Sequence, residues 1–345
     1  MAPTRSPAGV AVAARRSLVM GASGFLGSHV TRQLVERGDD VRVMLRHSSS
    51  TRGIDDLRVE RRYGDIGDRE AVRDAMADRE VVFYCVVDAR ATLADPAPLT
   101  ATNVVGLQHV LELAIDANLE KFVFLSTICT IAVSEDGRPV TEDMPFNWSE
   151  KCGDYVRTRL RAEELVLDAV RSRDLPAVLM CVSNTYGPRD WQPTPHGSVV
   201  ARAASGTMRA YARGAAAEVV GVEDAARAML LAAERGRPGE RYIISESYMS
   251  LKDILSIAAD ETGVRRPRIA VPMAMLYAGA SASRPLRALL PRRITPFLDV
   301  VRLLDVTSPA DHGKAERELG WSPAPTADAI RRAARFYVKH RPHCR

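Results

Sequence analysis

The feature that most constrains this chain is a glycine loop near its N-terminus, Gly21–Gly27, with the sequence GASGFLG. The loop follows the apolar run Leu18–Met20 directly and precedes a segment with helical spacing of apolar residues. In a strand-to-helix turn, Gly21 permits the tight bend and Gly24 lets the backbone approach a pyrophosphate, while Gly27 lets the helix pack closely on the strand. Because the helix N-terminus then presents unpaired N–H groups to phosphates, the loop predicts a dinucleotide-binding site.

Composition places the chain among ordinary globular proteins. Its 345 residues suffice for one or two domains, with 46% hydrophobic and 26% charged residues. The net charge of +5 is modest, and arginine is spread along the chain and not gathered in a stripe, so nucleic acid is not an expected partner. Only five of the 48 basic residues are lysine, which is a general bias towards arginine.

The five cysteines are scattered and form no C-x-x-C pair, which favours a reducing, cytoplasmic location. The seven histidines form no H-x-x-x-H or Cys/His cluster, so no metal site is predicted. Apolar runs are too short for a membrane span, and residues 1–15 are expected to form a disordered tail.

Strand and helix patterns alternate through the first half of the chain. This alternation predicts an α/β fold, a Rossmann-type doubly wound parallel sheet. The expected strands are residues 18–20, 41–45, 59–63, 81–87, 121–126 and 177–182, and the expected helices are 27–37, 69–77, 98–118 and 155–171.

The second half predicts a smaller α/β substrate lobe. The Rossmann domain is expected over residues 16–188, with 216–236 returning to it as a further strand and helix. The lobe would comprise 189–215 and 237–345. It begins with the segment 190–197, which is expected to be a loop because it contains two prolines, a tryptophan and a glycine. The lone His196 in this segment is expected to be solvated.

A second group of residues indicates which reaction the chain could catalyse. Thr127 ends a predicted strand, and Tyr155 and Arg159 lie four apart on a predicted helix, so they share one face. Together with the glycine loop, this pattern resembles the extended short-chain dehydrogenase/reductase superfamily. The resemblance implies that Thr127 orients a substrate oxygen and that Tyr155 is the general acid/base. The family has a lysine four residues after this tyrosine, which lowers the tyrosine pKa and holds the nicotinamide ribose.

Further matching motifs extend the resemblance over nearly the whole chain. They are Gly64-Asp65 after the third strand, the N-V-x-G segment Asn103–Gly106, the Y-G-P segment Tyr186–Pro188 and the L-G-W-x-P segment Leu319–Pro323. The runs 187–190 and 193–197 are most similar to the branch that holds dihydroflavonol-reductase-like and hopanoid-associated-epimerase-like proteins.

The resemblance also implies a set of site residues. Catalysis would involve Thr127, Tyr155 and Arg159, with Asn103 supporting a proton relay. Cofactor contacts would come from Gly21, Ser23, Gly24, Phe25, Leu26, Gly27, Arg46, Ser48, Asp65, Ile66, Val86, Val87, Tyr155, Arg159, Val182 and Asn184.

Arg159 departs from the family pattern, which has lysine at this position. In one interpretation the arginine replaces the family's lysine because of the general bias towards arginine, and the guanidinium still lowers the Tyr155 pKa. In the other, catalysis has been lost and an NAD(P)-binding regulatory protein remains. We favour the first, because Tyr155, Thr127 and Asn103 are all present.

Arg46 follows the second predicted strand, where a dinucleotide fold meets the adenosine ribose. NAD-preferring proteins usually place an acid there, whereas arginine suits a 2′-phosphate. Arg46, with Ser48 as a second donor, therefore favours NADP(H) over NAD(H).

The function expected from these features is NADP(H)-dependent reduction of a ketone or aldehyde, or oxidation of the alcohol, in a mainly apolar small molecule. A sugar-nucleotide epimerase or dehydratase with bound NAD(P) is the alternative within catalysis. By resemblance we expect a homodimer formed through the helical segments 98–118 and 155–171.

Overall fold

The computed structural model describes residues 14–90, 95–282 and 297–340. Its centre is a seven-stranded sheet in which every neighbouring pair is parallel, in the order β10-β6-β5-β4-β1-β2-β3. The strands are β1 (Arg16–Met20), β2 (Asp40–Leu45), β3 (Glu60–Tyr63), β4 (Val81–Tyr84), β5 (Lys121–Thr127), β6 (Ala177–Val182) and β10 (Arg241–Ile244). The predicted doubly wound α/β sheet is confirmed.

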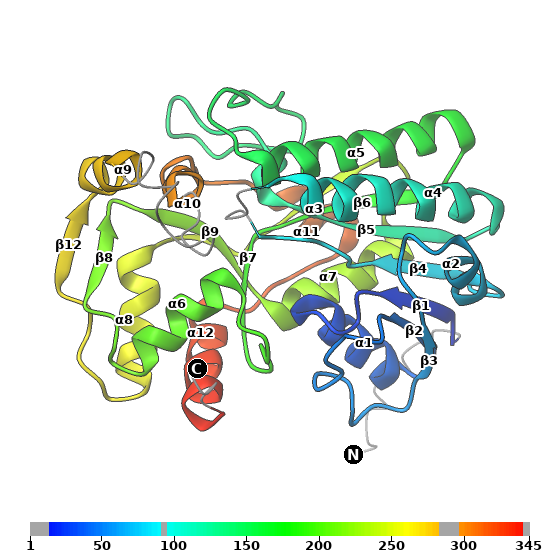
Figure 1. Cartoon of the computed structure of the whole chain (residues 1–345), viewed down its shortest axis with the longest axis horizontal. Helices are drawn as coiled ribbons and strands as arrows, with labels where there is room; N and C mark the ends of the chain where they lie inside the picture. Colours follow the sequence, from blue (N-terminus) through cyan, green and yellow to red (C-terminus); the bar gives the residue numbers. More distant parts are fainter. Residues whose placement is uncertain (1–13, 91–94, 283–296, 341–345) are drawn as a thin grey trace, which may run out of the picture.

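Helices cover both faces of this sheet (Figure 1). One face carries α1 (Phe25–Arg37), α7 (Val222–Arg235) and α11 (Gly313–Leu319). The other carries α2 (Arg69–Met76), α4 (Leu107–Asp116) and α5 (Asp154–Arg173). Because both faces are covered, β4 and β6 are buried along their whole length.

The remaining elements form a lobe at the other end of the molecule (Figure 1). Its sheets are β11-β9-β7 and β12-β8, from β7 (Asn184–Tyr186), β8 (Ala210–Arg213), β9 (Ala216–Gly221), β11 (Ser247–Ser250) and β12 (Ile269–Pro272). Its helices are α6 (Pro195–Ala204), α8 (Leu251–Glu261), α9 (Met273–Ala282), α10 (Phe297–Asp305) and α12 (Thr326–Lys339). A separate apolar core joins α6, α8 and α12.

The structure differs from the expected elements in several places. The strand expected over 81–87 ends at Tyr84. The helix expected over 98–118 consists of α3 (Ala97–Thr100), a π-helical stretch η1 (Ala101–Gly106) and α4. β10 joins the large sheet beside β6, although residues 237–345 were assigned to the lobe, and β9 pairs with β7 and β11 in the lobe, although 216–236 was assigned to the Rossmann domain. The sheet to which β9 and β10 belong depends on pairing with strands that are distant in the sequence.

Part of the expected loop at 190–197 is the start of a helix. Thr194 caps α6 by accepting a hydrogen bond from the Gly197 N–H at 3.1 Å, and Pro195 occupies the first helical turn. Proline is favoured there because its missing N–H would be unpaired in any case. Within the described residues, no helix is both long and apolar enough to cross a bilayer.

Candidate active site

The site lies where the strand order of the large sheet reverses. β1 and β4 are neighbours, yet the chain leaves β1 towards β2 and leaves β4 towards β5. The loops after these two strands therefore diverge, and ligands of open parallel sheets bind in the crevice between them. The glycine loop follows β1, and Val86, Val87 and Asp88 follow β4.

The geometry of the glycine loop leaves no room for side chains at two positions. Gly21 has a φ of 84°, and a Cβ there would lie 2.7 Å from the main-chain carbonyl of Cys85. A Cβ on Gly27 would lie 2.2 Å from the Gly21 oxygen. Gly24 caps α1 without a side chain to occupy the helix N–H groups. This cradle fits a pyrophosphate at a helix N-terminus.

Thr127 and Tyr155 meet at the carboxyl end of β5. Thr127 is the last residue of that strand, and its hydroxyl accepts a hydrogen bond from the Cys129 N–H at 3.2 Å. Tyr155 lies in the first turn of α5, and the Thr127 side chain is near enough to its phenol to lower the phenol's pKa. The pair predicted from sequence is thus brought together.

Arg159 reaches inward from the same face of α5 one turn later. It is 0% exposed, its guanidinium lies 5.0 Å from the Phe124 ring, and its Nη2 donates to the Leu125 carbonyl oxygen. Its Nε and Nη1 are buried without a partner in the described part of the chain. Buried donors normally find a partner, so these two nitrogens fit the hydroxyl groups of a nicotinamide ribose.

The pKa of Tyr155 reflects opposing effects. Burial of the phenol raises its pKa, as does the nearby Cys129 thiol, whereas Arg159 and the Thr127 hydroxyl lower it. Burial dominates, so the pKa lies above its ordinary value of about 10. Tyr155 is therefore protonated at neutral pH, which is the state needed to donate a proton.

Asn103 is buried in the π-helical stretch η1, and its side chain links the loop after β4 to helix α5. Its Oδ1 accepts from the Asp88 N–H at 2.8 Å, and its Nδ2 donates to the Asp88 carbonyl at 3.0 Å and to Thr158 Oγ1 at 3.2 Å. The Thr158 hydroxyl in turn donates to the Tyr155 carbonyl at 2.8 Å. These bonds tie the loop after β4 to the first turn of α5, and the relay role of Asn103 stays a prediction.

The other predicted cofactor residues lie around the same crevice. Arg46 and Ser48 are exposed in the turn after β2, where Ser49 Oγ accepts from the Arg46 N–H at 3.2 Å. Arg46 has no acidic partner within 4 Å among the described residues, although its positive charge helps to lower the pKa of Asp88. Of the remaining candidates, Asp65 and Ile66 follow β3, Val86 follows β4, Val182 ends β6 and Asn184 begins β7. Leu26 and Val182 are buried in the core, and Ile66 and Val86 pack against it.

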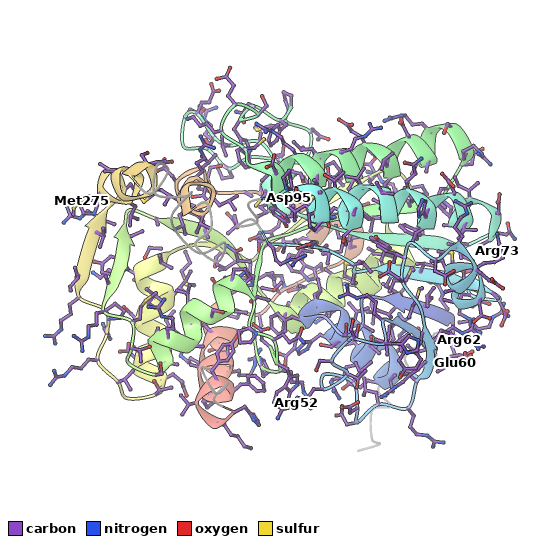
Figure 2. The ribbon with its side chains drawn as sticks, viewed as in Figure 1. Arg52, Glu60, Arg62, Arg73, Asp95 and Met275 are labelled. Carbon is purple, nitrogen blue, oxygen red and sulfur yellow. The ribbon has the colours of Figure 1, made fainter. Side chains whose placement is uncertain are left out.

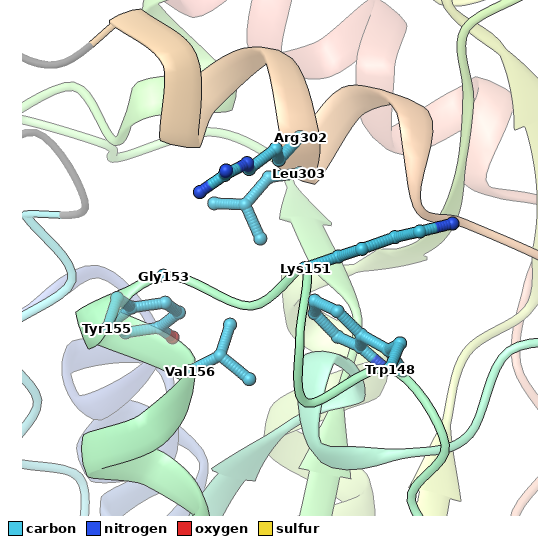
Figure 3. A pocket seen from close by; sticks show the side chains of 7 residues that line it. All are labelled: Trp148, Lys151, Gly153, Tyr155, Val156, Arg302 and Leu303. Carbon is cyan, nitrogen blue, oxygen red and sulfur yellow. The ribbon is translucent and has the colours of Figure 1, made fainter.

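A pocket opens in front of Tyr155 and is lined by residues that sequence reasoning missed (Figure 3). Trp148 and Val156 form part of its wall, and Leu303 of α10 points into it (Figure 3). The Lys151 side chain extends away from Tyr155 (Figure 3). The clustered apolar residues of the C-terminal region were the one sequence signal for Leu303, whereas Trp148 carried none because its neighbours form no regular element.

The segment expected to hold substrate, 190–197, is instead fixed to α12. Asp190 is buried, and its Oδ2 accepts from Tyr337 Oη at 2.6 Å and from the Thr194 N–H at 2.9 Å. Trp191 packs edge-on against Phe336 at 4.8 Å. His196 is not solvated as expected, because its Nε2 is buried and its ring packs against Tyr186 at 5.4 Å.

This burial makes His196 sensitive to acid. Burial lowers the His196 pKa to about 4, although a hydrogen bond with the Thr185 backbone opposes the shift. The unfolded chain, with a pKa near 6.5, binds a proton first as pH falls, so the stability contribution is present above pH 6.5 and is lost towards pH 4. We expect the free energy of unfolding to fall between pH 7 and 4.5 by about 2.5 kcal/mol more in the parent than in His196→Gln. Urea unfolding at pH 7, 5.5 and 4.5 measures this, and the exposed His47→Gln variant should follow the parent.

Next to Thr127 and Tyr155 lies a buried ionic network on α5. Glu163 Oε1 accepts from the Ser126 hydroxyl and from Thr130 Oγ1 at 2.6 Å, and Oε2 lies 3.1 Å from Arg241 Nη2. Arg241 also donates to the Thr130 carbonyl at 3.0 Å. The network joins the end of β5 to α5 and to β10, the strand that sequence placed in the lobe.

Removing the Glu163 charge leaves a buried cation without its counter-ion. Glu163→Gln is therefore expected to lower the free energy of unfolding by about 3 kcal/mol. Glu164→Gln is the matched control, because Glu164 is exposed and pairs with Arg161 at the surface, where an ion pair contributes at most about 1 kcal/mol. Urea denaturation compares the two. Equal effects would show that the buried network does not hold the end of β5.

Comparison with known proteins places this geometry in a family. Residues 17–245 match the model of the NAD dependent epimerase/dehydratase family. Sterol demethylase protein B of Methylococcus capsulatus is 32% identical over 93% of this chain and 98% of that protein. A ketoreductase of Stigmatella aurantiaca, named for a farnesyl dihydroquinoline oxide, is 30% identical over 92% of this chain and 96% of its own length.

Solved structures have the same fold as this chain. That of gox2253 superposes with a TM-score of 0.84 at 32% identity, covering 94% of this chain and 98% of that chain. The UDP-glucose 4-epimerase of Thermotoga maritima shares the fold, with a TM-score of 0.75 at 22% identity over 94% of this chain and 99% of that one. The chain therefore belongs to the NAD dependent epimerase/dehydratase family, within the extended short-chain dehydrogenase/reductase superfamily, and is an NAD(P)-binding enzyme of the oxidoreductase type.

Proposed function

We propose that this enzyme uses NADP(H) to reduce a ketone or aldehyde in a mainly apolar small molecule, with Tyr155 as the general acid. The observation that supports the proposal is that the Tyr155 phenol, with the Thr127 side chain near it, lies at a small pocket lined by Trp148, Val156 and Leu303 and also by Lys151 and Arg302.

Each of the three residues has a separate task in the proposed reaction. The Thr127 hydroxyl donates to the substrate oxygen, where negative charge develops. The Tyr155 Oη–H transfers its proton to that oxygen. Arg159 holds the ribose side of the cofactor and, as a fixed cation, stabilises the tyrosinate left after proton transfer. NADPH, when bound, supplies the hydride.

The relatives favour an apolar substrate over a nucleotide sugar. Three relatives that match over at least nine-tenths of this chain are named for a sterol, a dihydroflavonol and a farnesyl dihydroquinoline oxide. A UDP-glucose 4-epimerase of Lactobacillus helveticus matches over only 49% of this chain, at 29% identity. Trp148, Val156 and Leu303 give the pocket beside Tyr155 an apolar side, and Lys151 and Arg302 also line it.

The direct test is consumption of NADPH at 340 nm with a panel of cyclic and aromatic ketones and aldehydes. Turnover of at least one carbonyl, with little turnover of UDP-sugars, is the expected result. If NADPH binds but no carbonyl is reduced, the reductase proposal is wrong. An epimerase or a regulatory NAD(P)-binding protein then remains.

The proposed preference for NADP(H) depends on Arg46. Its side chain is exposed at the end of β2 without an ion-pair partner among the residues that the structure describes. A charge-assisted hydrogen bond is worth about 1.5–3 kcal/mol, so Arg46→Ala should weaken NADPH binding by about 10- to 100-fold. NADH binding should barely change, because NADH has no 2′-phosphate.

Nucleotide fluorescence titration measures both affinities. Arg73→Ala is the control, because Arg73 is exposed on α2 and should leave both affinities unchanged. Equal weakening of NADPH and NADH by Arg46→Ala would refute the proposed preference.

A further inference from the structure

The outer edge of the lobe is unlike the rest of the surface. We call it the lobe edge: β8, the segment 263–268, β12 and α9. Residues 209–213 and 263–277 contain five arginines and no aspartate or glutamate. β8 and β12 pair side by side, and β12 continues directly into α9 at the extreme end of the molecule (Figure 1).

Four of these arginines are exposed without an acidic partner among the described residues: Arg209, Arg213, Arg265 and Arg268. The fifth, Arg266, pairs with Asp260 at 2.6 Å. Strand register keeps the group together, because the Arg268 N–H donates to the Arg209 carbonyl at 3.1 Å and Arg213 pairs with Pro272.

Several exposed arginines on the sheet domain have acidic partners, although Arg46 and Arg73 have none among the described residues. Arg69 pairs with Glu112, Arg161 with Glu164 at 2.9 Å and Arg171 with Asp168 at 2.6 Å, although all three are exposed. What distinguishes the lobe edge is that four arginines lie close together there without an acidic partner among the described residues, and only Arg266 is paired, with Asp260.

The same edge exposes apolar side chains. Ile269 is 59% exposed and Met275 is 65% exposed, more than the other exposed large hydrophobic residues of the described chain. Met275 points outward at the end of the molecule (Figure 2). α9 contains no charged residue, and its exposed face consists of Ala274, Met275, Ala278 and Gly279. A surface helix of a protein surrounded by water normally carries charges on its outer face.

From this combination we propose that the lobe edge docks on an anionic lipid bilayer. Unpaired arginines are attracted to the negative headgroups, and Ile269, Met275 and the uncharged face of α9 enter the headgroup–acyl boundary. A second copy of this chain is a poorer occupant, because a two-fold contact would place like charges against each other. Nucleic acid would use the arginines but leave the exposed aliphatic side chains without a partner.

The docking surface adjoins the proposed active site. α9 packs against α10, and Tyr277 Oη donates to Asp305 of α10 at 2.9 Å. α10 also carries Leu303, which lines the pocket in front of Tyr155. A bilayer at the lobe edge would therefore lie next to the helix that contacts an apolar substrate. The docking itself does not depend on the proposed reaction.

The test is flotation of the full chain with extruded vesicles of phosphatidylcholine, with or without 30% phosphatidylglycerol, at 50 and 500 mM NaCl. We expect binding to the anionic vesicles at low salt only. Each basic residue near such a surface contributes about 1 kcal/mol, so Arg209→Gln with Arg213→Gln should lower partitioning on the order of 20-fold. Met275→Ser should also lower it.

The matched control is the pair Arg161→Gln and Arg171→Gln, which removes two exposed, ion-paired arginines from α5 and should leave flotation unchanged. Thermal unfolding and NADPH binding verify that every variant is folded. The proposal is overturned if anionic vesicles do not bind at 50 mM NaCl, or if the Arg209/Arg213 variant floats like the parent. It is also overturned if a single-stranded oligonucleotide binds through these arginines while vesicles do not, or if Met275→Ser changes the oligomeric state and not flotation.

Discussion

Tyr155→Phe should lower kcat for carbonyl reduction by about 10²- to 10⁴-fold while leaving NADPH affinity nearly unchanged. The phenol has a raised pKa, so it carries its proton at neutral pH, and it lies near the Thr127 side chain. Phenylalanine keeps the ring and its packing but removes the proton that must reach the substrate oxygen as negative charge develops. Because the ring remains, the pocket in front of it should still bind substrate.

The measurement is steady-state oxidation of NADPH with a carbonyl that the parent reduces, together with nucleotide fluorescence for binding. Tyr211→Phe is the control, since Tyr211 is a half-buried tyrosine of β8 without a side-chain hydrogen bond in the described structure. A Tyr155→Phe variant that turns over within a few-fold of the parent would show that another group donates the proton.

Substitution of Arg159 should have the second-largest effect. Arg159→Ala removes a fully buried cation, its bond to the Leu125 carbonyl and its contact with the Phe124 ring. We expect kcat/KM to fall by about 10²- to 10³-fold, which corresponds to about 3–4 kcal/mol. Arg159→Lys should retain most of the activity, because a lysine restores the cation at the family position.

A pH profile separates the electrostatic role of Arg159 from a merely structural one. The guanidinium lowers the Tyr155 pKa, so removing it should raise that pKa further. In the direction of alcohol oxidation, which needs the tyrosinate, the alkaline rise of kcat should therefore move to higher pH in Arg159→Ala and return in Arg159→Lys. Arg157→Ala is the control on the same helix, because Arg157 is exposed and 3.5 Å from Asp154. If Arg159→Ala turns over as fast as the parent, or if its profile does not move, the tuning role is wrong.

Local sequence patterns predicted the elements of the sheet domain well. The segments 18–20 and 177–182 are continuous apolar runs and 41–45 is apolar apart from Arg42, and the structure has strands at all three. The glycine loop was predictable because its function requires a particular backbone at each position. Both kinds of signal depend on neighbours within a few residues, and such neighbours are visible in a sequence.

Non-local packing decided what the sequence did not reveal. β10 joined the large sheet because its partner β6 lies about sixty residues earlier, and no local pattern encodes that pairing. Trp191 and His196 looked like loop residues and are packed by α12 and Tyr186, which are distant in sequence or beyond a turn. Trp148 likewise lies in the pocket wall because of contacts with residues that are distant in the sequence.

By itself, then, the sequence determined the sheet, the nucleotide loop and the pairing of Thr127 with Tyr155, because spacing along strands and helices fixes which residues share a face or an edge. Only the tertiary structure decided that Arg159 would be wholly buried with two nitrogens that have no partner among the described residues, that Glu163 would meet Arg241, and that four arginines of the lobe edge would lie together without an acidic partner in the described chain. Burial and ion pairing are properties of surfaces that meet across the fold, and a linear pattern does not specify which surfaces meet.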